Sequence, residues 1–95
     1  MATSKKVLGF YETFGTAQSE VDIITPTNGD YIFVWMICIE SDGYYKLYFP
    51  TAGLLIEGNG GITGSANVCK YGADDEPVKL TCDANTTVRV LYHEV

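Results

Sequence analysis

The chain has 95 residues, of which 46% are hydrophobic and 19% are charged, as expected for one folded domain spanning residues 1–95. Twelve acidic residues against six basic ones give a net charge of −6. This balance disfavours nucleic acid as a partner, because phosphate binding depends on Lys and Arg. No apolar run is long enough for a membrane helix, and the first ten residues lack the apolar segment of a signal peptide. We therefore expect no membrane partner.

The amino-acid composition favours β-strands. Seven Tyr, four Phe and one Trp are combined with ten Gly, and turn signals recur about every ten residues, which is typical of small sandwiches. In chain order the pattern predicts strands over residues 6–11, 19–25, 31–41, 44–49, 54–57, 62–70, 78–82 and 86–94. We predict an all-β fold, a single antiparallel β-sandwich that is jelly-roll-like and has about eight strands.

The longest apolar run covers residues 31–39, and Asp42-Gly43 after it is the strongest hairpin signal in the chain. A two-residue turn there would pair residue 41 with residue 44. Because side chains alternate along a strand, one face of this hairpin should be interior. That face carries Ile32, Val34, Met36, Cys38, Leu47 and Phe49.

The other face of the predicted hairpin is aromatic, with Ile39 and Lys46 beside its rings. Tyr and Trp are enriched at the centres of protein interfaces, so this face is the candidate protein–protein surface. Its site residues are Tyr31, Phe33, Trp35, Ile37, Tyr44 and Tyr48. Two alternatives remain open, namely coverage by a loop or by strand 6–11 of the same chain, and stacking of a carbohydrate on the rings. A one-residue bulge would also change which residues share this face.

The last two strands, residues 78–82 and 86–94, are predicted to form a hairpin around Asp83-Ala84-Asn85. In that register one apolar face holds Val78, Leu80, Cys82, Val88 and Val90.

The sequence predicts no enzyme, no cofactor and no metal site. His93 is the single histidine, and it stands in a strand where we expect it to face solvent. The acids fall mostly in turns, and those of residues 74–76 read as a solvated loop. Cys38, Cys69 and Cys82 are odd in number and are expected to be reduced, although one pair, such as Cys69 with Cys82, remains an alternative.

The chain from Gly29 to Val95 resembles a loose class of small β-sandwich proteins encoded among the structural genes of tailed bacteriophages. The likeness lies in the long apolar strand, the Ser-Asp-Gly turn at residues 41–43, the Gly-rich middle and the closing segment 80–95. Its most specific part is the Ala-Asn turn followed by Val-x-Val-x-Tyr-x-Glu-Val.

This resemblance implies a non-enzymatic virion protein, either a capsid decoration, a head-fibre or another minor head or tail component. Its partners would be further copies of itself, with a trimer favoured, and a capsid or other virion protein. It would be made in the host cytoplasm. The alternative is a small carbohydrate- or ligand-binding β-sandwich module.

Overall fold

The computed structural model describes residues 7–95, except for the side chains of residues 63–67. Its strands are β1 (Leu8–Phe14), β2 (Gln18–Ile24), β3 (Ile32–Phe49), β4 (Gly53–Tyr71), β5 (Val78–Cys82) and β6 (Thr86–Glu94). All of their pairings are antiparallel. The all-β, antiparallel prediction is confirmed. Lys6, the first residue of the first predicted strand, lies outside the described residues.

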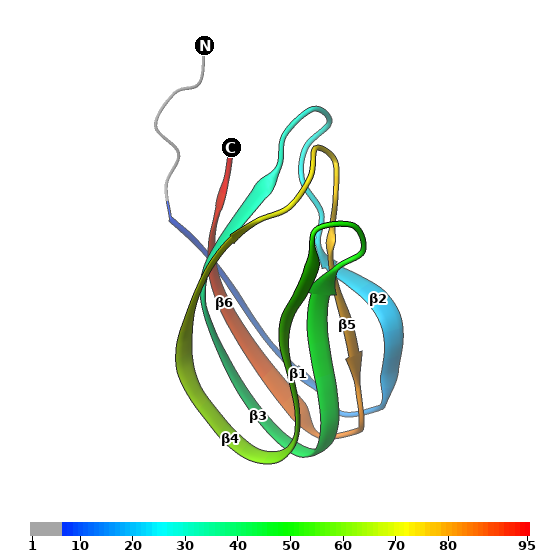
Figure 1. Cartoon of the computed structure of the whole chain (residues 1–95). Coiled ribbons are helices and arrows are strands. Elements are labelled where there is room, and N and C mark those ends of the chain that lie inside the picture. Colours follow the sequence, from blue (N-terminus) through cyan, green and yellow to red (C-terminus); the bar gives the residue numbers. More distant parts are fainter. Residues whose placement is uncertain (1–6) are drawn as a thin grey trace.

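Strand β3 is the centre of the sheet. Its residues 32–41 pair with β6, its residues 45–48 pair with β5, and β4 runs along its other edge. Strand β1 extends the sheet beyond β6, and β2 extends it beyond β5. We call β1, β6 and the adjoining parts of β3 and β4 the first half, and β2, β5 and the remaining parts of β3 and β4 the second half. The two halves curl toward each other as one sheet (Figure 1).

The predicted hairpin turn at Asp42-Gly43 is wrong, because β3 continues through these residues as one strand of 18 residues. The predicted strands 54–57 and 62–70 are likewise parts of one strand, β4, so the described residues form six strands rather than about eight. Residues 42–43 instead lie where β3 leaves β6 and begins to pair with β5. Gly43 is required there by a close approach, since a Cβ on it would lie 2.3 Å from Asp83 Oδ2.

A chain of hydrogen bonds fixes this corner. The Tyr44 amide donates to Asp83 Oδ2 and the Asp83 amide donates to the Tyr44 carbonyl, both at 2.8 Å. Thr86 Oγ1 donates to the Asp83 carbonyl at 2.9 Å, so its 2.7 Å bond to Ser41 Oγ must use the Ser41 proton. Ser41 Oγ in turn accepts from the Gly43 amide. Ser41 and Thr86 are buried, and burying a hydroxyl without a hydrogen bond costs free energy. The bond between these two hydroxyl groups avoids that cost.

The predicted hairpin between residues 78–82 and 86–94 is also wrong in its pairing. Strands β5 and β6 do not pair with each other, and both pair with β3 along successive parts of the same edge. The segment 83–85 therefore crosses from one half of the sheet to the other. The predicted apolar face is nevertheless interior, as its members Val78, Leu80, Cys82, Val88 and Val90 are all buried.

A bulge in β3 changes which residues form the core. Val34 pairs with Tyr92 and Met36 with Leu91, so one extra residue of β3 stands between these two pairs. Beyond this point the alternation of side chains is reversed. The predicted interior residues Ile32, Val34, Leu47 and Phe49 are indeed buried. Met36 and Cys38 turn outward, since they pair with the exposed Leu91 and Arg89, and Ile37 and Ile39 enter the core in their place.

The loop at residues 72–77 is not simply solvated, as the sequence predicted. Asp74 and Asp75 are exposed, but Glu76 is buried. Its carboxylate accepts hydrogen bonds from the amides of Thr51, Ala52 and Ala73. Glu76 thus joins the β3–β4 turn to the β4–β5 loop.

Glu76 should make folding stability depend on acid pH. Burial raises the pKa of its carboxyl, but hydrogen bonds from the amides of Ala73, Thr51 and Ala52 lower this pKa by a larger amount. The resulting pKa is below the ordinary value. A depressed pKa contributes stability above the ordinary value of 4.5, and this contribution is lost as pH falls below it. We expect Glu76→Gln to unfold more easily at pH 7, by about 1–3 kcal/mol, and to lose less stability than the wild type between pH 5 and pH 3. Urea unfolding across this range measures both; equal acid sensitivity of the two proteins would contradict the assignment.

The corner predicts an interaction between two substitutions. Gly43→Ala should destabilise the fold by about 1–3 kcal/mol through overpacking against Asp83. Asp83→Ala should cost about 1 kcal/mol through the lost bond to the Tyr44 amide. In the double variant the carboxylate is gone, so Gly43→Ala should cost less than it does alone. A double-mutant cycle by denaturant unfolding tests this, and strictly additive costs would show that the two residues do not interact.

Candidate functional site

Five rings meet on the outer surface of the first half. Three strands supply four of them, because Phe33 of β3 pairs with Tyr71 of β4 on one side and with His93 of β6 on the other. The fifth ring, Tyr31, directly precedes β3. The ring of Phe33 lies 4.5 Å from that of Tyr71 and 5.7 Å from that of Trp35, and Tyr31 lies 5.7 Å from Tyr71. We call Tyr31, Phe33, Trp35, Tyr71 and His93 the aromatic patch.

Trp35 is held in this patch by His93. The indole Nε1–H donates to His93 Nδ1 at 2.7 Å, and the two rings lie 5.3 Å apart. Since a ring nitrogen that accepts a hydrogen bond carries no proton itself, Nδ1 is the unprotonated nitrogen in this arrangement. His93 does face outward, as the sequence predicted, but it is half-buried and is bonded to Trp35 rather than to solvent alone.

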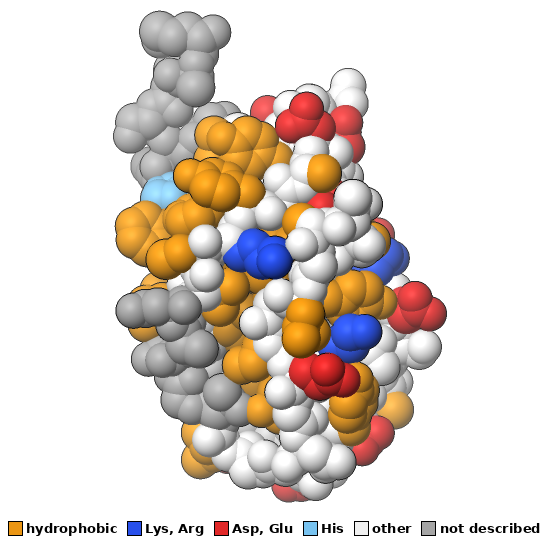
Figure 2. Space-filling view, in the orientation of Figure 1, with side chains coloured by type: hydrophobic (Ala, Val, Ile, Leu, Met, Phe, Trp, Pro, Cys, Tyr) orange, Lys and Arg blue, Asp and Glu red, His pale blue; other side chains and the backbone are white. Residues whose placement is uncertain are grey.

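The patch remains accessible in the part of the chain that the structure describes. Trp35 is 39% exposed and Tyr71 is 58% exposed. The alternative that strand 6–11 covers these rings is not what the structure shows, because β1 pairs with the edge of β6. Figure 2 shows hydrophobic side chains gathered beside the pale-blue His93. Further exposed apolar residues of the first half extend this surface, namely Tyr11, Ile62 and Leu91.

The six predicted interface residues do not form one surface. Tyr31, Phe33 and Trp35 lie in the aromatic patch, as predicted. Ile37 is wrong as a surface residue, because the bulge after Val34 turns it into the core, where it is 1% exposed. Tyr44 and Tyr48 lie in the second half, on the part of β3 that pairs with β4 and approaches β5.

Polar contacts surround Tyr44 and Tyr48. Tyr44 Oη donates to Glu57 Oε2 at 2.5 Å, and this hydrogen bond, together with burial, raises the pKa of Tyr44. Lys46 Nζ lies 4.8 Å from the centre of the Tyr48 ring. Beyond them Lys79 forms an ion pair with Asp22 at 2.7 Å, which raises the pKa of Lys79. This outer surface of the second half is polar and its groups already have partners.

Tyr71 and His93 are the members of the patch that the sequence did not predict. Each lies in a strand, but its neighbours on the adjacent strand depend on how the strands pair. The spacing of residues in the sequence does not define this pairing. The only available signal was the alternation of Arg89, Leu91 and His93, which puts His93 on the outward face of its strand.

No group of three or more His, Cys, Asp or Glu side chains that could hold a metal occurs among the described residues. The three cysteines are free, with Cys82 buried and Cys69 exposed. The alternative of a Cys69–Cys82 bridge is therefore wrong, and these residues belong to β4 and β5, which do not pair. None of the described segments is a helix that could span a membrane.

No family model, curated protein or solved structure matches this chain.

The bond between Trp35 and His93 can be tested by NMR, since the chain has a single tryptophan. A hydrogen-bonded indole proton resonates downfield and exchanges slowly with water. In His93→Phe the ring contact can persist but the acceptor is lost, so the indole proton should move upfield and exchange faster. Tyr92→Phe, next to it in β6, is the matched control and should leave the indole signal unchanged. An unshifted signal in His93→Phe would contradict the bond.

Proposed function

We propose that this chain is a non-enzymatic structural protein that assembles with other copies of itself through the aromatic patch. The observation that carries this proposal is the exposure of Trp35 and Tyr71 within a cluster of touching rings on a sheet surface. Aromatic rings bring a large apolar area with few rotatable bonds, which is why they dominate the energetic centres of interfaces. A contiguous exposed apolar surface of this kind is typical of an interaction site.

The charges favour a second copy as the occupant. Each copy carries a net charge of −6, so self-association needs a surface without acidic side chains. The five residues of the patch include no carboxylate. The exposed acids Glu12 of β1 and Glu40 of β3 lie in the first half but outside the patch, and Asp42, Asp74, Asp75 and Asp83 lie at the corner and in the β4–β5 loop. A symmetric assembly through the patch would bring rings against rings without placing a carboxylate of the patch in the contact.

The setting we propose is a bacteriophage virion, with the protein as a capsid decoration or a minor head or tail component. This part of the proposal is supported by the sequence resemblance of residues 29–95. In such a setting the copies would form an oligomer, with a trimer favoured, that docks on a capsid or another virion protein.

Trp35→Asp tests the patch. A charge in a desolvated interface is strongly unfavourable, so this variant should weaken self-association by about 100-fold or more. Because Trp35 is already 39% exposed, the variant should remain folded. Sedimentation equilibrium over a range of concentrations measures the association, and circular dichroism checks the fold.

Leu54→Asp is the matched control. Leu54 is 49% exposed and pairs with Tyr48 in the second half, so a charge there should leave association unchanged. A wild-type protein that stays monomeric at millimolar concentration and binds no capsid would overturn the proposal, as would equal effects of the two variants.

A carbohydrate-binding module is the second candidate, favoured by the exposure of the Tyr71 ring. Against it, the rings are tilted by 42–71° to one another, so they do not form one flat platform for a sugar. A change in Trp35 fluorescence with a glycan, lost in Tyr71→Ala, would favour this candidate over self-assembly.

A further inference from the structure

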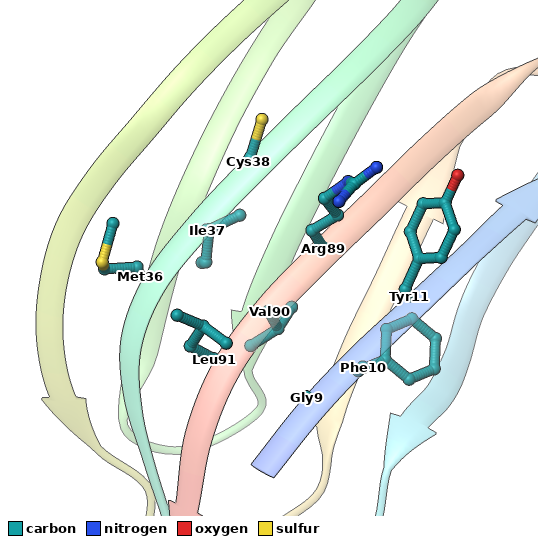
Figure 3. A pocket seen from close by; sticks show the side chains of 9 residues that line it. All are labelled: Gly9, Phe10, Tyr11, Met36, Ile37, Cys38, Arg89, Val90 and Leu91. Carbon is teal, nitrogen blue, oxygen red and sulfur yellow. The ribbon is translucent and has the colours of Figure 1, made fainter. Parts of the chain in front are cut away.

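A pocket opens on the outer surface of the first half, between β1, β6 and β3 (Figure 3). Its volume is about 400 Å³. Two neighbouring cross-strand rows form its walls. The first row is Gly9, Leu91 and Met36, and the second is Tyr11, Arg89 and Cys38.

Gly9 leaves one end of the first row open. It stands inside β1 opposite Leu91, where a residue with a side chain would continue the row. A Cβ built on Gly9 meets no atom within 4 Å, and the residue has no positive φ that would require glycine. A glycine inside a strand weakens the strand, and it often marks a place where a ligand or another backbone approaches closely. Neither a turn nor packing within the described chain accounts for this glycine.

Arg89 supplies a positive charge at one wall. Its guanidinium lies 4.2 Å from the centre of the Tyr11 ring. Among the described residues Arg89 belongs to no ion pair, although the chain has twice as many acidic as basic residues. An arginine stacked on a ring keeps its N–H groups at the edge of its plane, where they can bind a carboxylate.

We propose that this pocket binds a small organic anion with an apolar body. The carboxylate would bind Arg89, and the apolar part would lie over Gly9 against Leu91 and Met36. The volume of about 400 Å³ is within the range of small-molecule sites, which are mostly apolar with a few polar groups that orient the ligand. This inference goes beyond the proposed function and does not depend on it, because Trp35 and Tyr71 do not line the pocket.

Three probes with the same ten-carbon chain test the chemistry. Decanoate is anionic, decanol is neutral and decyltrimethylammonium is cationic, and each is titrated below the concentration at which it forms micelles. Amide NMR on the full chain should show decanoate shifting the signals of Gly9, Tyr11 and Arg89. Decanol should bind these residues more weakly and decyltrimethylammonium weakest. No shift at these residues with decanoate, or tighter binding of the cationic probe, would overturn the proposal.

Gly9→Val places a side chain in the pocket at a position where a Cβ meets no atom within 4 Å, and valine favours strands. Decanoate affinity should fall at least tenfold, while the thermal midpoint should stay equal or rise. Gly15→Val is the matched control, because a Cβ there also meets no atom within 4 Å but lies in the turn after β1. Retained decanoate binding in Gly9→Val would mean that the probe binds elsewhere, and this would overturn the site.

Arg89→Gln separates charge from shape. Loss of an ion pair at an exposed site should weaken decanoate binding by about two- to fivefold and leave decanol binding unchanged. Arg89→Lys keeps the charge but loses the planar N–H groups, so its affinity should be intermediate. Equal decanoate affinity in the wild type and Arg89→Gln would overturn the role of Arg89. Trp35→Asp should bind decanoate normally, which distinguishes this pocket from the aromatic patch.

Discussion

Asp83 holds strand β3 at the point where the sheet changes partners, and the rest of the fold depends on this corner. Its carboxylate and its main chain both bind Tyr44, and the carboxylate occupies the space where any residue other than Gly43 would have its Cβ. One continuous strand can therefore pair with β6 in its first part and with β5 in its second. This continuity lets one sheet curl around a core to which both halves contribute.

The bulge in β3 has an equally large effect on the surface. A strand of period two that gains one residue exchanges its inner and outer side chains beyond that point. Here the exchange falls between Val34 and Met36, so Ile37 and Ile39 enter the core while Trp35 stays outside. The extra residue also brings the Trp35 indole to His93. Alternation thus accounts for Tyr31, Phe33 and Trp35 in the aromatic patch, and the bulge ends the patch at Trp35 by turning Ile37 into the core.

The two halves of the sheet differ in what their outer surfaces can bind. In the second half, Tyr44 donates a hydrogen bond to Glu57, and Lys79 forms an ion pair with Asp22. In the first half the rings touch each other and leave apolar area exposed, and a pocket lies beside them over Gly9. Both proposals therefore concern the first half: the patch offers a broad apolar surface to a second copy, and the pocket offers a small volume with one positive charge to a ligand.

The sequence by itself determined the all-β class, most strand positions and the inward direction of Val78, Leu80, Val88 and Val90, because alternation is a local property of the chain. It also located three of the five patch residues. Only the tertiary structure decided the rest. Asp42-Gly43 continues the strand where β3 changes partners from β6 to β5, and it lies against Asp83, which is 40 residues away in the chain and reaches Gly43 only after folding. The same is true of Tyr71 and His93, whose neighbours are set by strand pairing, a long-range choice that no local spacing encodes.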